Sequence, residues 1–390
     1  MEWRVPLADL DYGQVEQEAA LAVLERRWLT MGAVTQELEE RFAAMVGVRH
    51  ALAVTNATVA LHLACLALGI GPGDEVIAPA LTFVATTNAA LYTGAEVRFA
   101  EICGAHDLNI SPEAIEACIT PATRAIMAVH YGGYPCRMRE IREIADRNNL
   151  FVIEDAAHAP GASLDGRGLG TWGEVGCFSF FSNKNLSTGE GGMLVTDRDD
   201  IAEKVRKLRS HGMTSLTWDR HQGHAFSYDV VELGYNYRID EIRSALGLVQ
   251  LEKLMANNER RRAITEQYRS LLAGMEVEMP FIESEGRPAY HIFPILLPAE
   301  ADRGRFMDEM RWRGVQTSIH YPPIHCFSYY RERYPGVSLP RTEEIASREV
   351  TLPLYPGMKE EDTAIVVEAV GESLQMAWKA ELSEPGQRPE

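Results

Sequence analysis

The chain has 390 residues, of which 46% are hydrophobic and 24% are charged, as is ordinary for a globular protein large enough for two domains. Its 56 acidic and 38 basic residues give a net charge of -18. A negative net charge repels nucleic acids and anionic membranes, and the sequence has no run of Lys and Arg that would bind a phosphate backbone. Both are therefore disfavoured as partners. A pocket for a small anion is still compatible with the negative net charge, because a few local hydrogen-bond donors are enough to bind the anion.

No stretch approaches the length of apolar sequence that crosses a membrane, and residues 1–6 lack the charged and apolar regions of a secretory signal. The six cysteines are scattered without a CxxC pair, and most lie in apolar runs, as reduced core residues do. We therefore expect a cytoplasmic protein in a reducing compartment, with no membrane partner and no nucleic-acid partner.

Residues 50–210 alternate short apolar segments with amphipathic ones, which predicts repeated βα units. The expected strands are 50–55, 75–79, 97–102, 123–130, 150–154, 176–181 and 192–196, and the expected helices are 58–68, 87–92, 138–148 and one that Ser111 and Pro112 open. Strands that are nearly continuous in apolar residues form a mostly parallel sheet with helices on both faces.

The pattern changes in the second half of the chain. A long helix is predicted over 239–271, followed by a mixed region with a strand at 290–297 and a helix at 302–313. We expect a large domain over 1–250, whose N-terminal segment packs toward a small α+β domain over 251–380. Residues 381–390, rich in proline and polar residues, are expected to form a flexible tail.

Lys184 and Asp155 are the most informative polar residues. Lys184 follows the predicted strand 176–181 in a segment rich in glycine, and Asp155 directly follows the apolar strand 150–154. A lysine amine can form a Schiff base with pyridoxal 5'-phosphate (PLP), and an aspartate can keep the pyridine nitrogen of this cofactor protonated, so that the ring accepts electrons. An acid is costly to bury unless it is paired, and a pyridinium is such a partner. Taken alone, Lys184 would be a solvated loop charge, which is the usual position of lysine.

Two segments are candidates to bind the phosphate of such a cofactor. Asn56, Ala57 and Thr58 stand where a predicted strand turns into a helix, so backbone amides and the Thr58 hydroxyl are available there. The same pattern is typical of an ordinary helix N-cap. Ser179 lies shortly before Lys184 and is a second candidate for the phosphate.

Two ring side chains are candidates to contact the cofactor ring. Phe83 follows the predicted strand 75–79 and is a candidate to stack on a flat ring, although a core position is more typical of a phenylalanine taken alone. His158 lies shortly after Asp155 and would support that carboxylate or stack near the cofactor, although it is also typical of a surface loop.

No metal site is predicted. His320 and His325 are close in sequence, but two prolines separate them and no acid lies nearby in the sequence. The glycines of 69–73 follow a helix and flank a proline, so they indicate a turn and not a dinucleotide-binding loop. GxSxG, HExxH and Walker A patterns are absent from the sequence.

The motifs in order carry more information than any one of them. They are residues 55–58, 79–83, 154–158, 178–180, 184–185 and 189–192, continued by 211–212, 234–238, 320–322 and 352–357. This set resembles the DegT/DnrJ/EryC1/StrS family of sugar aminotransferases over residues 5–375. The resemblance implies an α/β protein of PLP-dependent transferase fold type I. It has a mostly parallel seven-stranded sheet between helices in the large domain and a smaller α+β C-terminal domain.

The resemblance also implies a role for each candidate residue. Lys184 would be the Schiff-base lysine and the proton shuttle, and Asp155 the partner of the pyridinium. Cofactor contacts are implied for Asn56, Ala57, Thr58, Phe83, His158, Ser179 and Asn236, and substrate contacts for His320 and Tyr321. Asn236 would reach the phosphate of a neighbouring subunit, which implies a homodimer or higher homo-oligomer with shared active sites.

Two positions depart from the family pattern. Asn56, Ala57 and Thr58 stand where relatives usually have Ser-Gly-Thr, but alanine still presents its amide, so phosphate binding is expected to survive. Cys103 replaces the second acid of an Asp-Ile-Asp sequence that is frequent in relatives, which puts an acidic role there in doubt.

The implied function is a PLP-dependent aminotransferase that converts a keto-sugar to the amino sugar, with glutamate or glutamine as amino donor. The sugar is expected to be nucleotide-linked, such as a dTDP-, UDP- or GDP-linked 4-keto- or 3-keto-6-deoxyhexose. A keto-cyclitol aminotransferase of the scyllo-inosose type, an aromatic amino-acid synthase and a PLP-dependent sugar dehydratase are alternatives on the same scaffold. Dehydratase relatives carry histidine in place of the lysine, so Lys184 favours transamination. A non-catalytic regulator is disfavoured by Lys184, Asp155 and the net charge.

Overall fold

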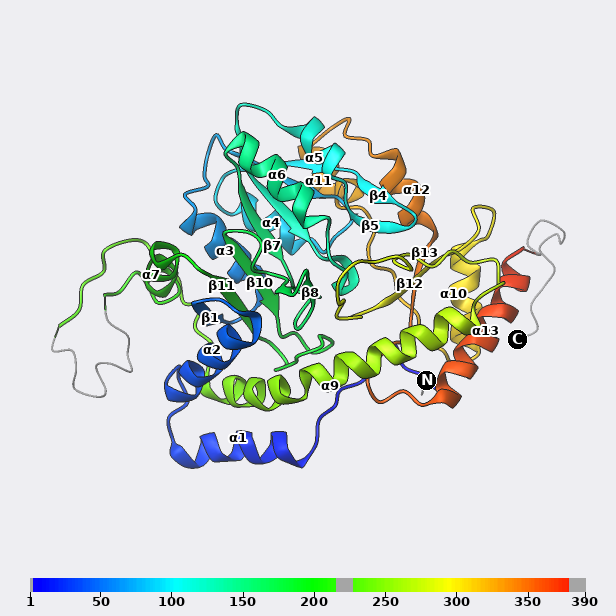
Figure 1. Ribbon diagram of the computed structural model, residues 1–390, viewed down its shortest axis with the longest axis horizontal. Coiled ribbons are helices and arrows are strands. Elements are labelled where there is room, and N and C mark those ends of the chain that lie inside the picture. The colour runs from blue at the N-terminus through cyan, green and yellow to red at the C-terminus, as the bar shows by residue number, and fades with distance from the viewer. Residues whose placement is uncertain (1–2, 215–226, 379–390) are drawn as a thin grey trace.

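The structure is a computed structural model that describes residues 3–214 and 227–378 (Figure 1). The predicted tail at 381–390 lies outside the described residues. The helices are α1 (Gln14–Arg26), α2 (Ala33–Val46), α3 (Ala57–Ala67), α4 (Ala85–Leu91), α5 (Pro112–Cys118), α6 (Met138–Asn148), α7 (Asp199–Leu208), α9 (Glu241–Leu271), α10 (Arg303–Trp312), α11 (Ser328–Arg333), α12 (Pro340–Arg348) and α13 (Glu360–Trp378). Short 3-10 helices occupy Tyr131–Gly133 and Ile324–Cys326.

Seven strands form the central sheet, in the order β1 (His50–Val54), β11 (Gly192–Thr196), β10 (Val175–Ser179), β7 (Phe151–Asp155), β6 (Thr123–Val129), β2 (Glu75–Pro79) and β3 (Glu96–Ala100). Only β11 runs antiparallel to its neighbours. Two-stranded ladders join β4 (Ile102–Gly104) to β5 (Asp107–Ile110), β8 (Ser163–Leu164) to β9 (Arg167–Gly168), and β12 (Phe293–Leu296) to β13 (Glu349–Leu352). The predicted mostly parallel α/β fold is confirmed.

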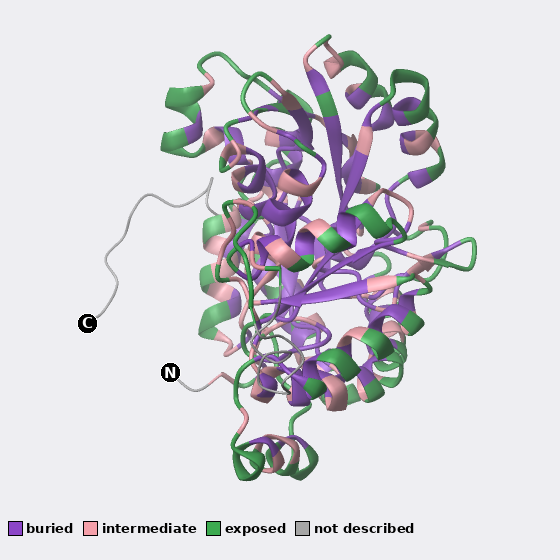
Figure 2. Cartoon of the chain, turned by 90° about the vertical axis from the view of Figure 1, so that its left-hand side faces the viewer, coloured by how far each residue is buried: buried purple, intermediate pink, exposed green. Residues whose placement is uncertain are grey.

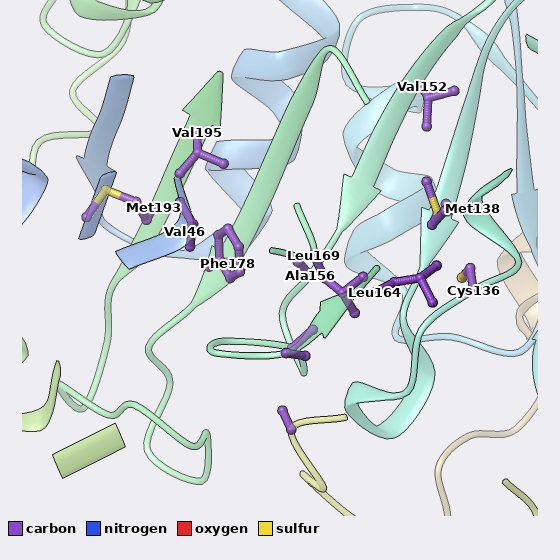
Figure 3. Close-up of a cluster of buried hydrophobic side chains, with 14 of the residues drawn as sticks. Val46, Cys136, Met138, Val152, Ala156, Leu164, Leu169, Phe178, Met193 and Val195 are labelled. Carbon is purple, nitrogen blue, oxygen red and sulfur yellow. The ribbon is translucent and has the colours of Figure 1, made fainter. Parts of the chain in front are cut away.

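The strands are buried on both faces, as their continuous apolar sequences require (Figure 2). Successive residues of a strand lie on opposite faces of the sheet and pack in different hydrophobic clusters. Val152 of β7 and Phe178 of β10 lie in the cluster with α2 and α6. Their neighbours Ile153 and Cys177 lie in the cluster with α3 and α7. Figure 3 shows the first cluster around Phe178. Helices therefore hold the sheet rigidly from both sides, and its carboxyl edge is a fixed platform.

A separate hydrophobic cluster lies in the C-terminal part of the chain, between α9, α10, α13 and the β12–β13 ladder. Tyr268, Phe306 and Val366 are among its members. The N-terminal segment joins it, because Val5 is buried there and forms a β-bridge with Val315. The 31-residue helix α9 links the two regions, since Leu254 lies in the cluster with α2 and α6. We retain the predicted domain limits at 250 and 380 as a proposal.

The predicted strand at 290–297 is shorter in the structure, where β12 covers only Phe293–Leu296. Tyr290 has a φ of 51°, in the left-handed region, so it cannot extend the strand. The backbone of His291 bonds instead to Gly132, which draws this segment toward the central sheet. No helix in the described parts of the chain is long and apolar enough to cross a membrane.

Glu241, in the first turn of α9, caps a different helix. The N-cap residue of α2 is Gly32, which has no side chain to accept a bond from the first turn. The buried carboxylate of Glu241 accepts the backbone amides of Gly32, Val34 and Thr35 at 2.8, 3.0 and 2.9 Å, and the Thr35 hydroxyl at 2.7 Å. This single side chain therefore fixes α2 against α9.

We predict that Glu241→Ala lowers the free energy of unfolding by about 3 kcal/mol, because it leaves several buried donors of α2 without an acceptor. Urea titration monitored by circular dichroism measures the change. The control is Glu252→Ala on the same helix, whose carboxylate is 60% exposed and pairs with Arg41 at 2.9 Å. This control should lose less than about 1 kcal/mol. Equal effects of the two substitutions would contradict the capping role.

Candidate active site

A cavity of about 400 Å³ opens at the carboxyl edge of the central sheet. Its lining comes from the segments that follow β1, β2, β7 and β10, and from the end of β6. These residues are Asn56, Ala57, Thr58, Leu61, Thr82, Phe83, Ala85, Val129, Asp155, Ala157, His158, Ser179, Phe181, Asn183, Lys184, Glu190, His320 and Tyr321. The cavity lies where open parallel sheets bind their ligands, and it brings together all the predicted site residues except Asn236.

Lys184 projects into this cavity from the loop after β10. Its Nζ lies 3.4 Å from Nε2 of the buried His291. Burial of the amine lowers the pKa of Lys184 from 10.5 to about 7, and the carboxylate of Asp155 acts in the opposite direction. A large share of the lysine is therefore neutral near pH 7 and able to accept a proton or attack a carbonyl.

The His291 ring is fixed in one orientation. Its Nδ1 lies 2.9 Å from Oδ1 of Asn185, whose Nδ2 donates to Asn258 on α9 at 2.8 Å and to the backbone of Ala289 at 2.7 Å. Because Asn185 offers an oxygen, His291 carries its proton on Nδ1, and Nε2 is left as an acceptor for the lysine amine. The residue that follows Lys184 thus orients the histidine that contacts it.

Asp155 ends β7 and is buried at the base of the cavity. Its Oδ2 accepts the Thr86 hydroxyl at 2.7 Å, and its Oδ1 accepts the backbone amide of Ala157 at 3.2 Å. Burial raises the pKa of Asp155, although these two donors and the Lys184 amine oppose the rise. The two donors orient the carboxylate but offset only part of the cost of burying its charge. A cationic group of a ligand would offset the rest.

His158 and Tyr321 both line the cavity and bond each other. The Nδ1 of His158 accepts the amide of Gly132 at 3.2 Å, so Nε2 carries the proton and donates to the Tyr321 hydroxyl, 3.1 Å away. Burial, together with the Lys184 charge, holds the pKa of His158 well below 6.5. The ring of Phe83 lies 6.0 Å from that of Tyr321, and 56% of Phe83 is exposed. This phenylalanine is therefore free to stack on a ligand, as the sequence suggested.

Unused amides at the start of α3 form the polar end of the cavity. The side chain of Asn56 caps the helix by accepting the amide of Val59 at 3.0 Å, so the N-cap interpretation is correct for Asn56 itself. The amides of Ala57 and Thr58 make no hydrogen bond within the described residues, and they point from a helix N-terminus, which favours an anion.

The backbones of Gly192 and Asn56 lie very close together at this polar end of the cavity. A Cβ placed on Gly192 would lie only 2.5 Å from the carbonyl carbon of Asn56. Glycine is therefore required where β11 passes the turn between β1 and α3. Ser179, whose Oγ accepts the Phe181 amide at 3.3 Å, lines the cavity as well. The largely neutral lysine amine, the buried carboxylate and these free amides fit the aldehyde, the ring nitrogen and the phosphate of PLP.

The two remaining predicted residues differ in their positions. Asn236 is exposed and lies outside the cavity, in a β-bridge with Ser210. His320 is buried in the cavity wall, and its Nδ1 lies 2.8 Å from the Thr351 hydroxyl.

Sequence reasoning missed His291 and Thr86, which bond the lysine and the aspartate. Neither stands in a distinctive motif, because Thr86 belongs to a helix of small residues and His291 lies far from Lys184 in the sequence. Asn183 was also overlooked, although it lines the cavity and its Oδ1 is buried without a partner in the described structure.

His325 does have an acid close in space, although none lies nearby in the sequence. Oε1 of Glu343 lies 2.9 Å and Sγ of Cys326 lies 3.6 Å from Nε2 of His325. The same carboxylate oxygen accepts the amide of Leu339 at 2.8 Å, at the start of α12. These bonds account for the cluster as a cap that holds α12.

Comparisons with known proteins agree with this site. The sequence profile of the DegT/DnrJ/EryC1/StrS aminotransferase family matches residues 11–371. The spore coat polysaccharide biosynthesis protein SpsC of Bacillus subtilis (strain 168) is 40% identical over 367 residues, which are 92% of this chain and 94% of SpsC.

Two solved structures are similar over nearly the whole chain. DesV of S. venezuelae, in complex with a ketimine intermediate, has a TM-score of 0.87 and 34% identity, with 95% of this chain and 99% of DesV covered. DesI, in the presence of its TDP-sugar product, has a TM-score of 0.87 and 30% identity, with 97% and 95% covered. The fold, the cavity and these similarities together show that this chain belongs to the DegT/DnrJ/EryC1/StrS family and is an aminotransferase of the PLP-dependent class.

Proposed function

We propose that this protein binds PLP in the cavity around Lys184 and transfers an amino group from glutamate or glutamine to a nucleotide-linked keto-sugar. The observation that carries the proposal is the placement of Lys184, Asp155 and the free amides of α3 in one cavity. PLP, when bound, supplies the carbonyl that reacts with amines and the ring that accepts electrons.

Each end of the cavity would hold a different part of the cofactor. Asp155, oriented by Thr86, would bond the ring nitrogen and keep it protonated. Phe83 and His158 would contact the faces of the ring. The amides of Ala57 and Thr58, with the hydroxyls of Thr58 and Ser179, would bind the phosphate. Asn56 would act indirectly, because its side chain caps α3.

Lys184 would hold the cofactor and move the proton. Its low pKa keeps the amine able to accept a proton from the α-carbon of the amino donor, and to return it later. The neutral His291 beside it would accept a hydrogen bond from the amine whenever the amine is released, and so would keep it near the reacting carbon.

The substrate assignment draws on the relatives and on the cavity wall. DesI is described with a TDP-sugar product, and SpsC takes part in polysaccharide biosynthesis. His320 and Tyr321 place polar atoms beside Lys184, in a position to meet sugar oxygens. The cavity is not fully enclosed, so the nucleotide of a nucleotide-linked keto-sugar would extend outward from it.

The proposed assembly is a homodimer in which each subunit completes the other's site. Asn236 supports this arrangement, because it is exposed and lies outside the cavity of its own chain. Its amide would then reach the cofactor phosphate of the partner subunit.

We predict that Lys184→Ala lowers turnover of L-glutamate with dTDP-4-keto-6-deoxyglucose by at least about 1,000-fold, because both the attachment point and the base are lost. Amino-sugar formation is measured by mass spectrometry. Lys207→Ala, which removes a surface lysine paired with Glu203 on α7, is the control and should keep full turnover. A Lys184→Ala protein that retained the activity of the wild type would refute the assignment.

The lowered pKa of Lys184 gives a second prediction, for protein freed of cofactor. Only the neutral amine reacts with trinitrobenzenesulfonate, so modification of Lys184 should rise as the pH increases through about 7. Lys207, whose pKa is raised by Glu203, should react only at much higher pH. Peptide mass spectrometry after brief labelling distinguishes the two sites. A Lys184 profile that follows that of Lys207 would show that burial does not activate the amine.

The shared site is tested by mixing two inactive variants. Lys184→Ala and Asn236→Asp are each expected to be impaired, the second because a carboxylate repels the phosphate. After mixing and reassociation half of the dimers are mixed, and each mixed dimer contains one site with both native residues, so activity should return to about a quarter of the wild-type value. If Asn236 served its own chain, no mixed dimer would contain an intact site and activity would stay low.

A further inference from the structure

Glu349, the first residue of β13, is a buried acid that the chemistry above does not use. Its side chain is fully buried. Oε2 accepts the backbone amide of His320 at 2.8 Å, and Oε1 lies 2.6 Å from the Thr351 hydroxyl. The guanidinium of Arg303 bonds the backbone oxygens of Ala346 and Glu349 and not the carboxylate. Burial raises the pKa of Glu349 to about 8, so both of its protonation states are accessible near neutral pH.

Thr351 connects this carboxyl group to His320. Its hydroxyl lies within hydrogen-bond distance of Glu349 on one side and 2.8 Å from Nδ1 of His320 on the other. The backbones of Ser318 and Thr351 also bond each other in both directions, at 3.2 and 2.9 Å, which fixes the histidine segment against β13. The three side chains therefore form a continuous line from the core to the cavity wall.

A hydroxyl has one proton, so the direction of this line depends on Glu349. When Glu349 is ionised, Thr351 donates to it and accepts from His320, which then carries its proton on Nδ1 and presents a lone pair at Nε2. When Glu349 is protonated, it donates to Thr351, and Thr351 donates to Nδ1. The proton of the neutral ring is then on Nε2.

The far end of the line opens into the active site. His320 lines the cavity together with Lys184, and its Nε2 makes no hydrogen bond within the described residues. Burial and the nearby Lys184 charge lower the pKa of His320 to about 4, so the ring stays neutral and changes only its tautomer.

We propose that Glu349, Thr351 and His320 form a proton relay that ends at His320 Nε2 and exchanges a proton there with the oxygen on the substrate's keto carbon. The proposal rests on the proposed function, which supplies the keto substrate. Nε2 gives its proton to the oxygen, Nδ1 takes one from Thr351, and Thr351 takes one from Glu349. The net change is one proton moved from Glu349 to the substrate oxygen, with no electron transferred, and the reverse sequence restores the relay.

Other charged or titratable groups surround the relay. Lys184, His158 and His291 face His320 from the cavity side, and Arg303 on α10 favours the ionised form of Glu349. The Tyr131 hydroxyl donates to the backbone oxygen of His320. Burial keeps the pKa values of Tyr131 and Tyr321 well above 10, and lowers those of His158 and His291 well below 6.5. Lys184 has a pKa of about 7 but bonds His291, so a pH step that Glu349→Gln removes belongs to Glu349, which we expect to titrate near pH 8.

The tautomer of His320 tests the relay without any substrate. Protein as purified, with ¹⁵N-labelled histidine, is examined by NMR from about pH 6 to about pH 10, and the His320 signals are assigned from His320→Asn. The wild type should change from the Nε2–H to the Nδ1–H form with a midpoint near pH 8. Glu349→Gln should hold the Nε2–H form throughout, because its oxygen must accept the His320 amide and its NH₂ must therefore donate to Thr351.

Thr351→Val and Thr351→Ser are a matched pair. Valine removes the hydroxyl at nearly constant shape and should abolish the pH step, whereas serine should retain it. With L-glutamate and dTDP-4-keto-6-deoxyglucose, kcat should fall at least about tenfold in Thr351→Val and recover in Thr351→Ser, with a smaller change in KM.

Two results would overturn the relay: a His320 tautomer that does not depend on pH in the wild type, or a pH step that persists in Glu349→Gln. A wild-type protein that shows the tautomer step but aminates no keto-sugar would count against the proposed substrate and not against the relay. The two failures are therefore distinguishable.

Discussion

Two groups of opposite charge are buried in one cavity, and neither is bonded to the other. Asp155 accepts hydrogen bonds from Thr86 and Ala157, and Lys184 contacts the neutral His291. Burial moves the pKa of each toward the neutral form, upward for Asp155 and downward for Lys184. A buried charge without a full partner is costly, and this cost is relieved by a ligand that brings a cation to the carboxylate and a carbonyl to the amine. The cavity is therefore matched to PLP at both ends.

The rest of the fold keeps these two groups in place. Asp155 stands at the end of β7, which is buried on both faces, and Lys184 follows the neighbouring β10. The lysine loop is held from behind, because Asn185 bonds Asn258 on α9 and the backbone of Ala289. α9 is in turn joined to α2 by Glu241. The helices outside the cavity thus restrict motion of the groups inside it, as a preorganised site requires.

The sequence predicted the parts of this arrangement that depend on local pattern. Continuous apolar runs such as 150–154 indicated buried parallel strands, and an acid or a lysine directly after such a run indicated the catalytic edge. Contacts between segments that are far apart in the sequence leave no local pattern from which they could be predicted. Nothing around His291 or Glu349 distinguishes them in the sequence, and their roles depend on the C-terminal region folding back onto the sheet. The strand predicted at 290–297 is shorter for the same reason, since the backbone of His291 bonds Gly132 instead of extending β12.

The most direct measurement is the absorption spectrum of the purified protein after addition of PLP, recorded before and after L-glutamate with no sugar present. We predict a visible band from cofactor attached to Lys184, which glutamate replaces with the band of the cofactor's amine form. This result would show cofactor binding and transfer from the donor together. A protein that develops no such band with added PLP would contradict the account, because a cavity with this lysine, this aspartate and these free amides would then lack the ligand that explains them.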